Sequence, residues 1–175
     1  APIIGSTRDF LTAAYLLTRK DTYVNREQLY TLLAAIDYHG DIPPPVKTDP
    51  EPLWSGKQIF SLLLPKDFNY FGRAAVCKHK HTSPDEDCPL EGVVVVRNGQ
   101  LIKGVIDKNS IGVERADTLY HRIVRDYGTA FAADFINKLC KLLNTFITIR
   151  GFSFSLDELG LPEDVRESIR QVIGD

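Results

Sequence analysis

The sequence predicts an α+β fold, with N-terminal helices, central antiparallel strands and C-terminal helices. Apolar residues recur at helical spacing before residue 37 and again after residue 117. Between these stretches, residues 93–96 are four consecutive valines, which favour a buried strand. Asn98 and Gly99 follow them and precede a second apolar run. This dipeptide predicts a hairpin, because both residues tolerate positive φ.

Two helices are expected near the start of the chain. The first covers residues 6–18, with Ser6 as its N-cap and Asp9 three residues later. The second begins after its cap, Asn25. Its apolar face consists of Leu29, Leu32, Leu33 and Ile36. The prolines at 43–45 end this helix, because proline lacks an amide proton and holds the preceding residue extended.

Residues 54–64 are expected to form a strand after a turn at Ser55 and Gly56. The segment begins with Trp54, the only tryptophan of the chain. A lone tryptophan beside an apolar strand belongs to the core more often than it stacks on a base. We therefore expect Trp54 to be buried.

The C-terminal part is expected to hold three helices. The first covers residues 117–127 and ends at Gly128, and the second covers about 130–149. The second helix carries a wide apolar stripe of Phe131, Phe135, Leu139, Leu142, Leu143 and Phe146. Cys140 lies on the same helix and is expected to belong to the core. A last amphipathic helix follows, with Pro162 in its first turn.

Composition restricts the class of protein. The chain has 175 residues, a net charge of −2 and three cysteines, and no apolar run approaches the ~20 residues that span a bilayer. The charge gives no general signature of nucleic-acid binding, and an odd cysteine count argues against a disulfide framework. The chain begins at Ala1 with neither Met nor a signal peptide. We therefore expect a cytoplasmic protein, and either an excised fragment or a chain that has lost its initiator Met.

Cys77, His79, His81 and Cys88 form the one metal-like cluster in the sequence. Zinc binds cysteine sulfur and histidine nitrogen tetrahedrally, and in a strand the first three residues would share one face. Their spacing departs from the usual paired arrangement of zinc ligands. The alternative is a polar loop with two incidental thiols, so a zinc site and a plain loop both stay open.

A series of blocks in the sequence resembles the largest subunit of DNA-directed RNA polymerases. The most specific blocks are L-T-R-K-D-T at 17–22, L-W-S-G-K-Q at 53–58 and N-G-Q-L-I-K-G-V-I-D-K at 98–108. Further blocks in the same order are residues 2–5 with 9–12, 42–45, 123–128 and 150–153. The residues of these blocks look most like those of the archaeal subunit, with some features of eukaryotic polymerase III.

The resemblance implies a pore domain over residues 1–157, with residues 158–175 as the start of the funnel region or an unassigned tail. In that family the pore domain forms the wall of the secondary channel beneath the active centre, where nucleotides enter and backtracked RNA is extruded. The implied partners are the other polymerase subunits, the DNA template, the RNA transcript and nucleoside triphosphates, with no membrane. Polyanions pass such a wall, so basic and polar side chains should line one face.

The residues that match the family's blocks supply the candidates for this face. They are Arg8, Asp9, Arg19, Lys20, Lys57 and Gln58. Arg8 stands where the family usually has glutamine, which puts an amide-specific contact in doubt. The alternative is that these charged side chains are ordinary solvated surface.

The family's catalytic string, D-F-D-G-D, does not occur in the chain. In the whole enzyme its carboxylates hold Mg²⁺, and the string belongs to an upstream segment. The resemblance thus implies a non-catalytic piece of a nucleotidyltransferase that acts in transcription. The competing hypothesis is a zinc-stabilised protein-interaction module without catalysis. A stand-alone enzyme is disfavoured, because no catalytic constellation is visible.

Overall fold

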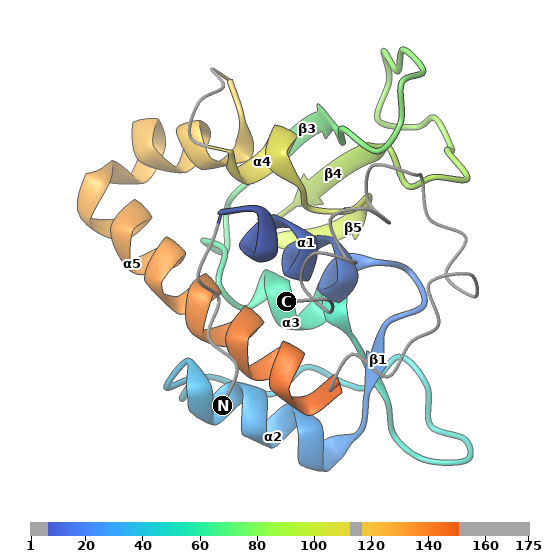
Figure 1. Ribbon diagram of the computed structural model, residues 1–175, viewed down its shortest axis with the longest axis vertical. Coiled ribbons are helices and arrows are strands. Elements are labelled where there is room, and N and C mark those ends of the chain that lie inside the picture. The colour runs from blue at the N-terminus through green and yellow to red at the C-terminus, as the bar shows by residue number, and fades with distance from the viewer. Residues whose placement is uncertain (1–6, 113–116, 151–175) are drawn as a thin grey trace.

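The structure is a computed structural model that describes residues 7–112 and 117–150 (Figure 1). Its elements are α1 (Thr7–Thr18), β1 (Tyr23–Val24), α2 (Arg26–Ala35), β2 (Trp54–Ser55), α3 (Gly56–Ser61), β3 (Tyr70–Arg73), β4 (Val93–Arg97), β5 (Gln100–Lys103), α4 (Lys108–Ile111) and α5 (Leu119–Arg150). Within these ranges the helices are combined with two small antiparallel sheets. The predicted α+β class is confirmed. The expected cap Ser6 and the last expected helix lie outside the described residues.

The helix α2 begins as its sequence predicts. The Asn25 side chain accepts a hydrogen bond from the Gln28 backbone N–H at 2.9 Å, and Gln28 Oε1 accepts one from the Asn25 N–H at 3.0 Å. This capping box satisfies two backbone donors that a helix start otherwise leaves unpaired. The predicted apolar face is buried in full, at Leu29, Leu32, Leu33 and Ile36.

Residues 54–64 do not form the expected strand. Only Trp54 and Ser55 are extended, as β2, and they pair with β1 before the chain turns into α3. Ser55 Oγ accepts from the Gln58 N–H at 3.1 Å, and Gln58 Oε1 accepts from the Ser55 N–H at 2.9 Å. This second capping box starts a helix where the apolar run alone suggested a strand. Trp54 is 4% exposed, which confirms that it is core.

Gly56 sets how closely α3 approaches α1. A Cβ at this position would collide with the Leu17 carbonyl group of α1. Glycine therefore allows the two helices to lie almost backbone to backbone. The helix α3 also contacts β5, so α3 links the N-terminal helix to the sheet.

The three-stranded sheet has the order β3-β4-β5, antiparallel throughout. Val93 to Val96 are all buried, as the valine run predicted. In β4 and β5, Arg97 lies opposite Gln100, and the register is irregular between Val95 and Val96. Asn98 and Gly99 lie between the two strands with φ values of 49° and 74°.

The helix α5 contacts both α1 and α2, and Figure 1 shows it running along one side of the molecule. Its helical geometry breaks at Gly128, where φ is 90°, as the predicted helix end indicated. The stripe from Phe135 to Phe146 is buried, but Phe131 is only partly buried. Cys140 is also only partly buried, so its assignment to the core was wrong. It lies beside the inward line of Leu139 and Leu143 rather than on it.

No helix within residues 7–112 and 117–150 combines the length and hydrophobicity needed to cross a bilayer.

Candidate functional site

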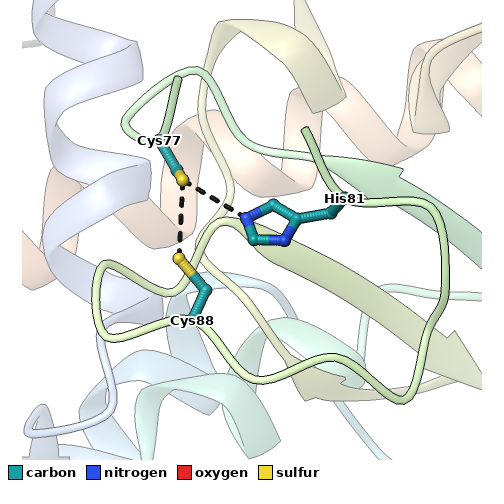
Figure 2. Close-up of side chains that lie close together, drawn as sticks. All are labelled: Cys77, His81 and Cys88. Atoms are coloured by element: carbon teal, nitrogen blue, oxygen red, sulfur yellow. Dashed lines mark hydrogen bonds between the residues drawn. The ribbon is translucent and has the colours of Figure 1, made fainter. Parts of the chain in front are cut away.

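The long connection between β3 and β4 brings three of the predicted metal ligands together (Figure 2). Cys77 Sγ lies 3.3 Å from His81 Nε2 and 3.5 Å from Cys88 Sγ. We call these three residues the Cys–His cluster. They lie in an irregular loop rather than in the strand that would have put residues 77, 79 and 81 on one face. The loop folds back between two paired strands, and this brings Cys77, His81 and Cys88 together.

His79, the fourth predicted ligand, lies at the edge of the cluster. Its Nδ1 is 3.5 Å from Cys77 Sγ, and its backbone N–H donates to the same sulfur at 3.4 Å. It does not belong to the group in which all ligand atoms are within 4.8 Å of one another. His79 is an exposed residue, whereas Cys77 is 1% exposed.

Glu86 fixes the orientation of His81. Its Oε2 lies 2.9 Å from His81 Nδ1, and its Oε1 accepts from the N–H groups of Thr82 and Ser83 at 2.9 and 3.0 Å. These hydrogen bonds, first from Thr82 and then from His81, lower the pKa of Glu86 to about 2. The hydrogen bond to Glu86 also raises the pKa of His81. An ionised carboxylate can only accept, so His81 Nδ1 carries a proton and Nε2 faces the sulfurs.

The two thiols have different surroundings. Burial raises the pKa of the Cys77 thiol. Burial also opposes ionisation of Cys88, but hydrogen bonds from the N–H groups of Gly92 and Leu90 outweigh it and lower the Cys88 pKa. Gly92 lies so close to Cys77 that a Cβ there would collide with the Cys77 Cβ. Two sulfurs and one imidazole nitrogen are a donor set that suits zinc.

A second polar group, which we call the lysine junction, consists of Lys20, Lys57 and Glu91. Lys57 Nζ donates to Glu91 Oε1 at 2.6 Å and also to the Thr18 carbonyl oxygen. The Lys20 backbone N–H donates to Glu91 Oε2 at 2.9 Å. The Lys57 and Glu91 side chains are only 13% and 16% exposed. Burial lowers the pKa of Lys57, and Glu91 partly opposes that effect.

The lysine junction adjoins the Cys–His cluster. The Glu91 N–H donates to the Cys88 carbonyl oxygen at 2.9 Å, which closes a turn between the two groups. A surface hollow of about 270 Å³ lies beside them, and Lys20, Lys57, Cys88, Glu91 and Lys103 are among the residues that line it.

The six predicted channel residues do not form one group. Arg19, Lys20 and Lys57 gather at the C-terminal end of α1, where Lys57 Nζ meets Thr18. Asp9 lies in the first turn of α1, at the other end of that helix, and the Arg8 side chain lies outside the described residues. Both polar atoms of the Gln58 side chain bond within the chain, because its Oε1 caps α3 and its Nε2 donates to the Pro44 carbonyl oxygen at 2.8 Å.

Glu86 and Glu91 are site residues that the sequence interpretation missed. Glu91 pairs with Lys57, 34 residues earlier, and no local pattern marks such a pair. A signal was present for Glu86, since an acidic residue near predicted histidine ligands is a common outer-shell partner.

Comparison with known proteins gives consistent matches along most of the chain. The family model described as RNA polymerase Rpb1, domain 3, matches residues 1–159. The subunit Rpo1N of DNA-directed RNA polymerase from Sulfolobus acidocaldarius is 36% identical over 168 residues, which is 96% of this chain and 19% of that protein. Rpo1N from Methanothermobacter thermautotrophicus is 38% identical over 168 residues, 96% of this chain and 18% of the relative.

A eukaryotic relative is similar to the same degree. DNA-directed RNA polymerase III subunit rpc1 from Schizosaccharomyces pombe is 37% identical over 170 residues, which cover 90% of this chain and 12% of the relative. The chain therefore spans less than a fifth of the length of the curated relatives it matches.

Proposed function

Because the chain belongs to the RNA polymerase Rpb1 domain 3 family, we propose that it is one segment of the largest subunit of a DNA-directed RNA polymerase, of archaeal type. The observation that carries the proposal is the family match over residues 1–159. The whole enzyme would be a nucleotidyltransferase that copies DNA into RNA. Its other subunits, the template, the transcript and nucleoside triphosphates would be the partners of this segment.

Within that enzyme, we propose that the segment forms part of the wall of the secondary channel below the active centre. The support is the lysine junction at the end of α1. The buried pair of Lys57 and Glu91 anchors this corner, and the exposed Lys20 lies two residues after the end of α1. A rigid corner that presents a cation attracts anions such as nucleoside triphosphates or an extruded RNA end.

The segment itself is proposed to be non-catalytic. In this reading Mg²⁺ acts in the whole enzyme and is held by carboxylates outside residues 1–175, because the D-F-D-G-D string is absent from the sequence. The task of the segment is then to shape the path of nucleotides and RNA.

The channel role is tested with the reconstituted whole enzyme carrying Lys20→Ala. Lys20 is the suitable target because its exposed side chain can change without breaking a buried contact, unlike Lys57 or Gln58. We expect the apparent KM for nucleotides to rise about threefold or more, with a weaker response to added salt. Lys66→Ala, at another exposed lysine, is the matched control. Equal KM values in both variants, with unchanged recovery from backtracking, would refute the channel role.

A protein-interaction role remains a second candidate for the loop alone. The observation that favours it is the Cys–His cluster, which offers a way to stabilise a loop of residues 74–92 without a core of its own. The two candidates are compatible, because a loop in a multisubunit enzyme can contact a neighbouring subunit.

A further inference from the structure

We propose that Cys77, His81 and Cys88, with His79 as the fourth ligand, bind one Zn²⁺ ion, and that this ion fixes Glu91 against Lys57. The proposal concerns the loop between β3 and β4, and it does not depend on the channel role.

The distances in the Cys–His cluster are close to those of a tetrahedral zinc site. With Zn–S near 2.3 Å and Zn–N near 2.05 Å, tetrahedral angles place two sulfurs about 3.8 Å apart and a sulfur and a nitrogen about 3.6 Å apart. The observed separations are 3.5 Å between the sulfurs and 3.3 Å from Cys77 Sγ to His81 Nε2. Small side-chain adjustments would therefore seat the ion.

The direction of the lone pairs in the Cys–His cluster favours a bound cation. His81 Nδ1 is committed to Glu86, so the lone pair of Nε2 points at the two sulfurs. Carboxylate–histidine pairs of this kind orient the ligands of protein zinc sites. Soft sulfur together with imidazole favours zinc over magnesium or calcium, which prefer oxygen ligands.

His79 completes the coordination by a side-chain rotation. Its Nδ1 already lies 3.5 Å from Cys77 Sγ, and the exposed position of the residue leaves its ring room to rotate. Its backbone N–H donates to the Cys77 sulfur, which stabilises a thiolate there.

The effect on Glu91 follows from the chain between the two groups. Cys88 and Glu91 are joined by the hydrogen bond from the Glu91 N–H to the Cys88 carbonyl oxygen, and Glu91 has a φ of 56°. A non-glycine residue in this left-handed region needs its surroundings to hold it. A metal bond at Cys88 would supply that restraint and so order the carboxylate that receives Lys57 Nζ and the Lys20 N–H.

The test measures metal content and affinity on the purified 175-residue chain. We expect one zinc per chain by elemental analysis, lost in Cys77→Ser and kept in the matched control Cys140→Ser. Replacement by Co²⁺ should give the sulfur-to-cobalt charge-transfer absorption of a thiolate site. Glu86→Gln, which leaves every ligand in place, should weaken zinc binding about 10- to 100-fold. His79→Ala should bind zinc more weakly than the unaltered chain.

The proposed effect of zinc binding on Glu91 is measured in a separate experiment. Zinc should slow hydrogen exchange of the Lys20 amide, which donates to Glu91, by about tenfold or more, as expected when local opening is suppressed. A folded chain that binds no zinc or cobalt on titration would overturn the proposal. So would a Cys77–Cys88 disulfide found by mass measurement in the freshly purified chain, or a Cys140→Ser variant that loses metal as Cys77→Ser does. Unchanged exchange at Lys20 in zinc-loaded chain would overturn the coupling.

Discussion

Lys57 illustrates how strongly a single side chain depends on its surroundings. Its ammonium group lies between Glu91 and the Thr18 carbonyl group, and its exposed fraction is 13%. Removing two charges from water costs free energy that the pairing only partly returns. A buried pair is therefore weak evidence for high stability. Breaking it from one side, however, leaves an uncompensated charge.

We expect Lys57→Met to destabilise the chain by about 3–5 kcal/mol, because Glu91 would be left buried without its cation. The double variant Lys57→Met with Glu91→Gln should lose less than the sum of the two single variants, with a coupling energy on the order of 1–3 kcal/mol. Urea unfolding of the four chains measures the cycle. Strictly additive losses would mean that the two side chains do not interact in solution.

Metal ligands that lie close together in the sequence could be predicted from it, whereas hydrogen-bonded pairs of distant residues could not. Cys77, His81 and Cys88 lie within one short stretch, so their shared ligand chemistry could be predicted before their geometry was known. Glu91 binds Lys57 and the Lys20 N–H across 34 and 71 positions. Such separations are set by how whole elements pack, so no residue spacing could have revealed them.

The helix α3 shows how capping can override hydrophobic patterning. Residues 59–64 are largely apolar, and that run gave the wrong prediction of a strand. Ser55 and Gln58 stand three residues apart just before it, which is the pattern of a capping box. The same pattern at Asn25 and Gln28 begins α2, where the helical period of the apolar residues agreed with the cap. When a capping box and the hydrophobic pattern of a short segment predict different structures, the capping box can determine which one forms.

The first half of α5 is tied to the segment before β3 by hydrogen bonds, of which the one from Tyr127 to Asp67 is the shorter. Tyr127 Oη donates to Asp67 Oδ1 at 2.6 Å, immediately before the break at Gly128. The Tyr127 ring also lies edge-on to the buried Phe68, at 6.1 Å between centroids. This anchor holds the helix next to the point where its backbone dihedral angles are not helical.

The hydrogen bond from Tyr127 to Asp67 leads to a prediction about how stability depends on pH. It raises the pKa of Tyr127 to about 12, from an ordinary value of 10.0. The folded chain thus holds this proton more tightly than the unfolded chain does. The stability that the bond contributes should be fully present below pH 10.0 and lost as the pH rises through about 12.

Carbon-13 NMR of labelled tyrosine rings measures the titration, with Tyr127→Phe to assign the signal. We expect the midpoint to return toward 10.0 in Asp67→Asn. An unchanged midpoint in that variant would exclude Asp67 as the cause.

Over residues 7–112 and 117–150 the buried apolar residues form a continuous core cluster, and other apolar side chains lie at the surface. The core cluster joins residues from the N-terminal helices, the three-stranded sheet and α5. Large hydrophobic residues that are exposed include Tyr30, Ile42, Val46, Phe71, Leu90 and Ile102. The curated relatives are more than five times longer than the aligned region, so the rest of such a subunit offers surfaces that could cover them.

The proposal that this chain is a non-catalytic segment of a larger enzyme can also be tested by activity. Nucleotidyl transfer to a growing RNA needs metal ions that are held by clustered carboxylates. These ions stabilise both the attacking and the leaving oxygen. The sequence contains no D-F-D-G-D string. The metal group predicted at residues 77–88 offers sulfur and imidazole ligands, which suit zinc rather than magnesium.

The purified chain should therefore extend no RNA primer on a DNA template in the presence of Mg²⁺ and nucleoside triphosphates, whether or not zinc is bound. A primer-extension assay, with a reconstituted whole enzyme as the positive control, measures this directly. If template-dependent extension persisted in the isolated chain and was lost in a Lys20→Ala variant, residues 1–175 would themselves hold a catalytic centre. The non-catalytic role would then have to be abandoned, because the lysine junction would bind nucleotide for chemistry and not only for passage.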